Sequence, residues 1–154
     1  FNPLIKLDME LKNSMRLVVE LKRDRALSLS LDNNLLTETK GMDYSVGVGY
    51  RVKDLKFRTN VRGRQSVSSG DLNLKADLSF RDNMTIIRNL EILDNKVTAG
   101  QSIWSFKLSA DYALSESFNA VFFYDHLFSE FAISTAFPQT TIRSGITLRY
   151  NFGD

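Results

Sequence analysis

The chain has 154 residues, of which 43% are hydrophobic, and its 20 basic and 18 acidic side chains leave a formal net charge of +2. So small a charge argues against a nucleic-acid partner. The sequence contains no cysteine, which excludes disulfides, zinc–thiolate sites and a cysteine nucleophile. It has no apolar run of about 18 residues, so no transmembrane helix is expected. The mean hydropathy of −0.20 suits a soluble globule, and equally a membrane β-barrel in which only alternate residues meet lipid.

The N-terminal part of the chain alternates between apolar and polar residues. Residues 3–12 read PLIKLDMELK, a period of two that predicts a β-strand. Residues 15–31 keep one parity, which favours a single long strand whose charged middle, Arg23 and Arg25, projects beyond the lipid on one side. Two strands joined by a short turn are the alternative. Residues 12–14 and 32–34 are turn candidates.

Residues 43–51, DYSVGVGYR, place Tyr44 and Tyr50 on one side and two glycines on the other. The glycines allow close approach of a neighbouring backbone or of the barrel contents, or they mark a bend at a barrel corner. Residues 59–71 have no apolar period and predict a loop. The basic trio at 62–64 could contact a phosphate, but a solvated loop is favoured because no aromatic residues interleave.

Alternation returns at residues 71–81, followed by a candidate two-residue turn at Asp82 and Asn83, and by a less regular apolar stretch at 84–92. Residues 102–112 form the clearest interior strand. Within it, Trp104 and Tyr112 are eight residues apart, about 27 Å along a strand. In a strand tilted at about 45°, that separation is near the height of the apolar band between two aromatic girdles. Tyr44, Tyr50, Trp104 and Tyr112 are therefore predicted to lie at the lipid interface. A turn at 115–117 leads to a further strand.

The last strand is the most regular one. Residues 140–152, TTIRSGITLRYNF, alternate strictly and end on an aromatic residue. The run polar–x–Gly–x–x–apolar–x–aromatic resembles the C-terminal signal strand that barrel-assembly machinery reads in outer-membrane proteins. On that resemblance the signal residues are Gly145, Leu148, Tyr150 and Phe152. An ordinary amphipathic final strand of a soluble sheet is the alternative.

Parity alone does not say which face lies inside. A soluble lipocalin-like barrel would turn the apolar residues inward. Three features favour the reverse: the apolar residues are too bulky for a small interior, the polar face mixes charges with small residues, and the aromatics lie toward strand ends. Charges of both signs on adjacent strands can pair across the sheet inside a wet lumen. We therefore expect an all-β, antiparallel, up-and-down transmembrane barrel, with eight to ten strands in one unit covering residues 1–154.

Five apolar residues have the wrong parity for a lipid-facing position: Val121, Phe123, Phe131, Ile133 and Phe137. They could form a patch toward the lumen or rim that contacts a partner, a plug or passing substrate. The favoured alternative is a bulge or turn between Leu127 and Ala132 that resets the parity.

The sequence offers no catalytic constellation. His126 is the single histidine and is interpreted as an interfacial residue at a strand end. No serine lies in a nucleophile motif and no phosphate-binding loop is present. We expect neither an enzyme nor a cofactor or metal site.

Five segments in order, RALSLSLDNNLLTE, DYSVGVGYRVKDLKF, NLKADLSFRDNMTIIRNLE, TAGQSIWSFKLSADYALSESFNAVFFYD and STAFPQTTIRSGITLRYNF, resemble the extreme C-terminus of the SprA/Sov family. These are outer-membrane translocons of the Bacteroidetes type 9 secretion system. The resemblance covers residues 13–152. It implies a very large barrel that exports folded cargo through a wide lumen, with a PorV-like lateral barrel and a plug protein as partners.

On this resemblance the chain supplies only the closing strands, because family members are many times longer. The chain also starts FNPLIK, without an initiator Met or signal segment, so we expect a processed chain or a fragment. The final strand would pair with the first strand of the remaining barrel. The rival interpretations are a complete small outer-membrane barrel acting as adhesin or pore, and a soluble barrel that binds an apolar ligand.

Overall fold

The computed structural model describes residues 3–61, 64–92, 94–115, 117–133 and 137–152; for 57–61 and 64–68 it describes the backbone alone. Seven β-strands make up this part of the chain. They are β1 (Ile5–Leu11), β2 (Met15–Ser30), β3 (Leu35–Val61), β4 (Arg64–Asn89), β5 (Asp94–Ala113), β6 (Phe118–Phe131) and β7 (Gln139–Tyr150). Within these described ranges no helix has the length and apolarity that a membrane crossing requires.

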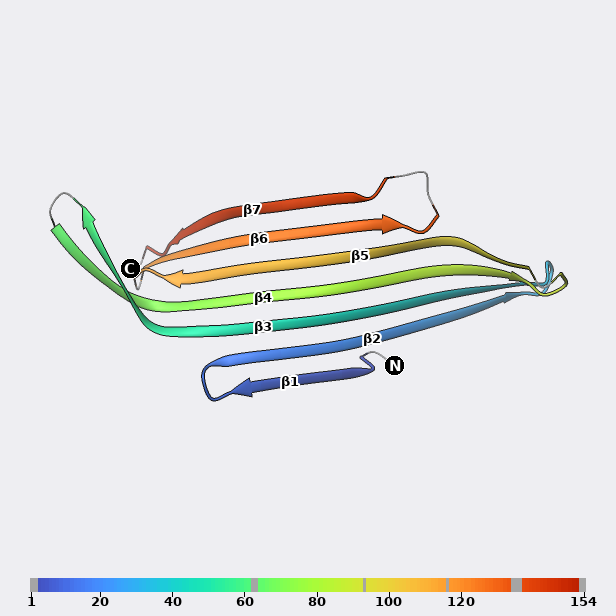
Figure 1. The fold of residues 1–154 in the computed structure, drawn as a ribbon, viewed down its shortest axis with the longest axis horizontal. Coiled ribbons are helices and arrows are strands. Elements are labelled where there is room, and N and C mark those ends of the chain that lie inside the picture. The colour runs from blue at the N-terminus through green and yellow to red at the C-terminus, as the bar shows by residue number, and fades with distance from the viewer. Residues whose placement is uncertain (1–2, 62–63, 93, 116, 134–136, 153–154) are drawn as a thin grey trace.

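All seven strands belong to one antiparallel sheet in which each strand pairs with the next one along the chain, in the order β1 to β7. Figure 1 shows the result as a single layer of long ribbons, with β1 and β7 at opposite edges. The predicted all-β, antiparallel, up-and-down class is confirmed. The sheet is open, and its seven described strands are fewer than the eight to ten expected.

The strands differ greatly in length. β3 has 27 residues and β4 has 26, whereas β1 has 7 and β7 has 12. β3 and β4 run well past the other strands only at the end that holds Val61 and Arg64 (Figure 1), because at the opposite end β2 and β5 reach as far, with Ser30 paired to Leu35 and Asn89 to Asp94. Residues 15–30 form one strand, as favoured from the sequence.

Turns at two predicted places are confirmed. Residues 12–14 connect β1 to β2 and residues 31–34 connect β2 to β3. Ser14 has φ 57° and Asn34 has φ 49°, a left-handed conformation that closes a tight connection and that asparagine tolerates well.

Two predicted breaks are wrong. Asp82 and Asn83 lie inside β4, paired with Met42 and Gly41 on one side and with β5 on the other. A turn there would break backbone hydrogen bonds to both neighbouring strands, whereas the strand keeps them. The Asp82 carboxylate also accepts a hydrogen bond from the Ser102 hydroxyl at 2.7 Å.

The predicted loop at 59–71 is a strand hairpin instead. β3 and β4 stay paired from Leu55 with Gly70 to Val61 with Arg64. The sequence of 59–71 lacks the alternation of apolar and polar residues, and a loop was predicted for that reason. A two-stranded hairpin with neither face packed against another layer does not need such alternation. Residues 62 and 63 of the basic trio lie outside the described residues.

A bulge in β3 separates this hairpin from the rest of the sheet. The register shifts between Val52 and Leu55, and Asp54 has φ 53°. Asp71 of β4 accepts hydrogen bonds from the backbone N–H of Asp54 at 3.2 Å and from the Arg51 guanidinium. One carboxylate thus satisfies the backbone donor that the extra residue would otherwise leave unpaired.

The sheet builds almost no core of its own. Tyr112 is the one hydrophobic residue that is buried among those described, and its hydroxyl donates to the Leu55 carbonyl at 3.1 Å. Most large apolar side chains are half-buried or exposed. Since apolar burial is the dominant favourable term in folding, this sheet requires an apolar environment or a partner to cover one face.

Candidate membrane-facing surface

The strand register places most of the apolar side chains of the seven strands on one face. Antiparallel partners point to the same side of a sheet, and the pairs link apolar residues in continuous rows. One row runs from Leu7 through Val19, Val46, Leu78 and Phe106. We call this surface the apolar band. Its members are Ile5, Leu7, Met9, Leu11, Met15, Leu17, Val19, Leu21, Tyr44, Val46, Val48, Tyr50, Val52, Leu72, Leu74, Ala76, Leu78, Phe80, Trp104, Phe106, Leu108, Ala110, Tyr112, Phe118, Ala120, Phe122, Tyr124, Phe128, Ile142, Ile146, Leu148 and Tyr150.

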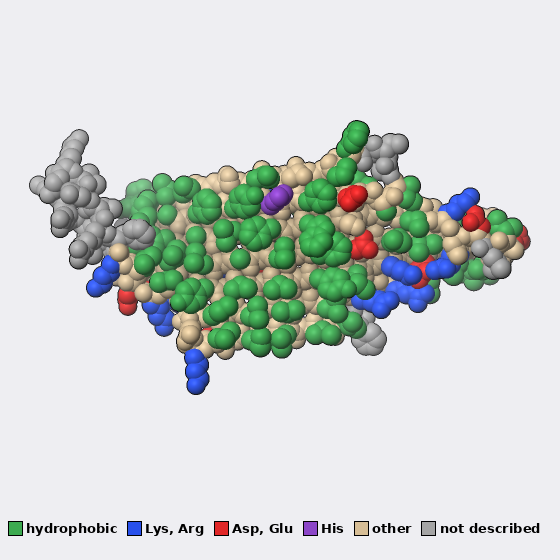
Figure 2. Space-filling model, viewed as in Figure 1, with side chains coloured by type: hydrophobic (Ala, Val, Ile, Leu, Met, Phe, Trp, Pro, Cys, Tyr) green, Lys and Arg blue, Asp and Glu red, His purple; other side chains and the backbone are tan. Residues whose placement is uncertain are grey.

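Figure 2 views this face, on which hydrophobic side chains form a continuous field across the middle of the sheet while charged ones gather toward the ends. The side chains are open to the surroundings: Ile146 is 70% exposed and Trp104 is 48% exposed. An exposed apolar surface that crosses seven strands is far larger than the few hundred Å² usual on a soluble monomer.

Aromatic rings mark both ends of the band. Tyr44, Phe80, Trp104 and Phe128 follow one another in register across β3 to β6. The ring centroids of Phe80 and Trp104 are 4.4 Å apart, and those of Tyr44 and Phe80 are 6.4 Å apart.

At the other end lie the predicted interface residues Tyr50 and Tyr112, together with Phe118 and Tyr150, whose centroids are 6.3 Å apart. The aromatics predicted for the interface therefore occupy two opposite margins of the band. His126 lies inside β6, one row inward from the Trp104 and Phe128 margin, paired with Phe106 and Ile142. The expectation that it marks a strand end is wrong.

The opposite face carries charged residues that pair across strands. Arg16 bonds to Asp8 at 2.6 Å, Arg81 to Asp43 at 2.7 Å, and Arg143 to Asp125 at 3.3 Å. We call this the polar face. Each exposed pair contributes at most about 1 kcal/mol, but their alternation of sign keeps like charges from lying side by side.

Glycines on the polar face give room to side chains of the adjacent strands. A Cβ on Gly47 would stand 2.6 Å from the Asp77 carboxylate, and one on Gly41 would stand 2.3 Å from that of Asp24. The side chains of β2 and β4 thus fold over the bare backbone of β3. A shallow hollow of about 320 Å³ remains beside Gly47 and Gly49, bordered by Arg16 and Lys75.

The residues of unexpected parity lie on the polar face or in a connection. β6 keeps an unbroken register with β5 through Phe131, so the bulge expected between Leu127 and Ala132 is absent, because continuous backbone pairing leaves no extra residue to reset the parity. Val121, Phe123 and Phe131 share the polar face. Ile133 and Phe137 follow the end of β6 and are 50% and 86% exposed.

The C-terminal strand places the predicted signal residues on both faces. Leu148 and Tyr150 belong to the apolar band, and Phe152 follows β7 with its ring 4.7 Å from that of Tyr150. Gly145 points the other way, opposite Phe123, whose ring lies 2.9 Å from where a Cβ would stand. The packing of the Phe123 ring against Gly145 therefore explains why a residue without a Cβ is suited to this position, which the sequence motif alone does not explain.

A charged cluster lies on the same face as the band, beyond its Tyr44 margin. Glu38 is completely buried, and its carboxylate accepts bonds from Arg25 and Arg88 at 2.6 Å each, with the Lys40 ammonium at 3.4 Å. These cations, Arg88 foremost, lower the pKa of Glu38 to about 2. Nothing in the alternation pattern predicts this cluster, because its members have the parity of lipid-facing residues.

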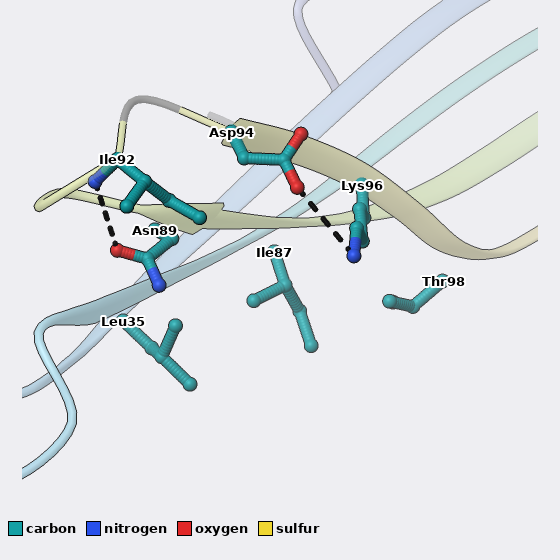
Figure 3. A pocket seen from close by; sticks show the side chains of 7 residues that line it. All are labelled: Leu35, Ile87, Asn89, Ile92, Asp94, Lys96 and Thr98. Carbon is teal, nitrogen blue, oxygen red and sulfur yellow. Dashed lines mark hydrogen bonds and ion pairs between the residues drawn. The ribbon is translucent and has the colours of Figure 1, made fainter.

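The far end of β3 to β5 also holds a small cavity of about 200 Å³ (Figure 3). Its lining mixes Leu35, Ile87 and Ile92 with the ion pair of Lys96 and Asp94. The Asn89 side chain accepts from the backbone N–H of Ile92 at 3.3 Å. The polar groups of the cavity are thus engaged with one another or with the turn: Asn89 with the backbone of the turn, and Lys96 with Asp94 within β5. In the part of the chain that the structure describes, no group of three or more His, Cys, Asp or Glu residues could hold a metal ion.

These features define an open antiparallel sheet with one apolar face edged by aromatics and one polar face laced with ion pairs. No protein-family model matches the chain, and no curated protein matches its sequence.

Proposed function

We propose that this sheet is a section of the wall of an outer-membrane β-barrel, and that the barrel is a protein-export translocon of the type 9 secretion class, to which the sequence bears a resemblance. The apolar band faces lipid, and the polar face borders a water-filled lumen wide enough for folded cargo. A plug protein, a PorV-like lateral barrel and the rest of the barrel wall are the partners of this proposal.

The observation that carries the membrane assignment is the apolar band itself. Its rows stay in register over seven strands, and aromatic margins eight residues apart along β5 bound it. Eight residues correspond to about 27 Å of strand, which at a tilt of about 35–45° spans about 19–22 Å of the apolar height of about 25 Å in outer-membrane barrels. A soluble barrel would bury this face against itself, whereas here it stays open among the described residues.

The position of the edges favours a large barrel over a small one. In a closed barrel of about eight strands, the first and last strands are neighbours. Here β1 and β7 lie at opposite edges of the sheet (Figure 1). Exposed strand edges pair readily with further strands, so both edges of this sheet are places where the wall continues. In such a wall the chain has a structural role: it forms part of the lumen boundary, and gating of the pore falls to the partner proteins.

Site-specific photo-crosslinking tests this proposal. A photoreactive residue at Leu78, within the band, is expected to label membrane lipid, while one at the neighbouring Ser79, on the polar face, is expected to label none. The export assignment adds a second expectation: a stalled secreted protein labels Ser79 and does not label Leu78. Lipid labelling from both positions, or from neither, would refute the membrane orientation. If Leu78 labels lipid but Ser79 labels no cargo, the chain would still be part of a membrane-barrel wall, and the assignment to a protein-export translocon would be refuted.

A further inference from the structure

Basic residues border the apolar band on its own face. Arg23 and Arg25 follow Leu21 on β2 with the same parity, and Lys40 of β3 is the register partner of Arg25. Figure 2 shows basic side chains gathered beside the hydrophobic field toward one end. The register between β2 and β3 is unbroken from Met15–Tyr50 to Ser30–Leu35. The backbone positions of the three cations are therefore fixed next to one another in the paired strands.

Glu38 holds Arg25 in place but leaves hydrogen-bond donors of the Arg25 guanidinium free. Arg25 gives only its Nε to the carboxylate, at 2.6 Å, which leaves both terminal amino groups of its guanidinium available. Arg88 binds Glu38 through Nε and Nη2 and Asn95 through Nη1, so it is the fully engaged member. Arg23 forms no ion pair with any residue that the structure describes.

The charge balance of the cluster favours an anion. Three cations, Arg25, Lys40 and Arg88, contact the single Glu38 carboxylate, which leaves two positive charges uncompensated. Arg23, two residues before Arg25 on the same face of β2, adds a third. The cross-strand row of Arg23 also holds Asp82 and Glu130, but Met42 of β3 separates Arg23 from Asp82, Asp82 accepts a hydrogen bond from Ser102, and Glu130 lies two strands beyond Asp82. Guanidinium groups bind phosphate through paired, charge-assisted hydrogen bonds.

We propose that Arg23, Arg25 and Lys40 bind the phosphate of an anionic lipid headgroup at the margin of the apolar band, with Glu38 as the positioning residue. This inference rests on the proposed membrane placement. We identify the anion as a lipid headgroup because of the height of these residues relative to the apolar core of the membrane. Arg23 and Arg25 lie two and four residues beyond the Leu21–Tyr44 row, or about 7 and 13 Å along the strand. With a strand tilt of about 45°, these positions fall about 5 and 9 Å above the apolar core, where headgroups lie.

The test removes two charges without touching the Glu38 bonds of Arg25 and Arg88. The double variant Arg23→Gln/Lys40→Gln is compared with the matched control Lys107→Gln/Arg143→Gln, which removes two charges from the polar face. Each protein, extracted in its native assembly, is placed in nanodiscs of equal parts phosphatidylglycerol and phosphatidylcholine. Native mass spectrometry then counts the lipids that each assembly retains.

We expect the unmodified protein and the control to retain phosphatidylglycerol over phosphatidylcholine, and the double variant to lose that preference at least threefold. An unchanged preference in the double variant, or an equal loss in the control, overturns the inference. Complete displacement of the retained lipid by millimolar inorganic phosphate also overturns it, because a free anion would then be the ligand. Lipid crosslinking from Leu78 is measured in the same samples: if it persists while the preference is absent, the headgroup site fails and the proposed function stands. If it is absent, both fail.

Discussion

The cost of placing a charge on the apolar band is the sharpest test of what covers it. Leu108 lies midway along the band, four residues from Trp104 and four from Tyr112, and its partners are Ala76 and Tyr124. If lipid covers this face, Leu108→Arg puts a guanidinium near the bilayer midplane, which costs about 2–4 kcal/mol in outer-membrane barrels. The same change at Leu148, which pairs with Ala120 in the Tyr112 row at the margin, is expected to cost about 0–1 kcal/mol.

The assay is urea unfolding from lipid vesicles, followed by heat-modifiable migration, with Ser109→Arg as control. Ser109 is next to Leu108 but faces the polar side, between Lys75 and Phe123, where an added charge meets water. We expect the cost to follow the order Leu108, then Leu148, then Ser109. Equal costs at Leu108 and Leu148 would indicate a protein-packed face without a depth gradient. A larger cost at Ser109 would invert the assigned orientation.

Three further predictions address packing and charge. Gly70→Ala is expected to destabilise the protein by about 1–3 kcal/mol, because its Cβ would stand 1.7 Å from the backbone carbonyl oxygen of Ala113 in β5. Gly49→Ala is expected to be tolerated, because the nearest atom to its Cβ would be 3.8 Å away, an ordinary van der Waals contact. Denaturant midpoints measure both. The depressed pKa of Glu38, about 2, stabilises the fold above the ordinary glutamate pKa of about 4.3, and this contribution is lost as the pH falls through 2. A Glu38→Gln variant should therefore show a flatter dependence of unfolding midpoint on pH between 5 and 2. Arg143→Ala, which removes an exposed pair with Asp125, should cost less than about 1 kcal/mol, and the difference should vanish at high salt.

The turns at 12–14 and 32–34 and the single strand over 15–30 were within reach of sequence reasoning, because each depends on local chemistry. Two of the failures, at 59–71 and at Asp82 with Asn83, arose where cross-strand pairing decided the conformation. Polar residues with turn preference remain extended when strands on either side satisfy their backbone groups, as Asp82 does between β3 and β5. The β3 bulge had a signal that was available: apolar parity changes from even at Val52 to odd at Leu55.

The sequence by itself determined which residues share a face, since the two-residue period of a strand is a local property of the backbone. It also identified both aromatic margins and the mixed charges of the polar side. Only the tertiary structure decided which residues meet across strands, and hence the Glu38 cluster, the contact of Phe123 with Gly145, and the placement of β1 and β7 at opposite edges. Those depend on strand order and register, which are set by pairing between separate segments of the chain and leave no trace in local alternation.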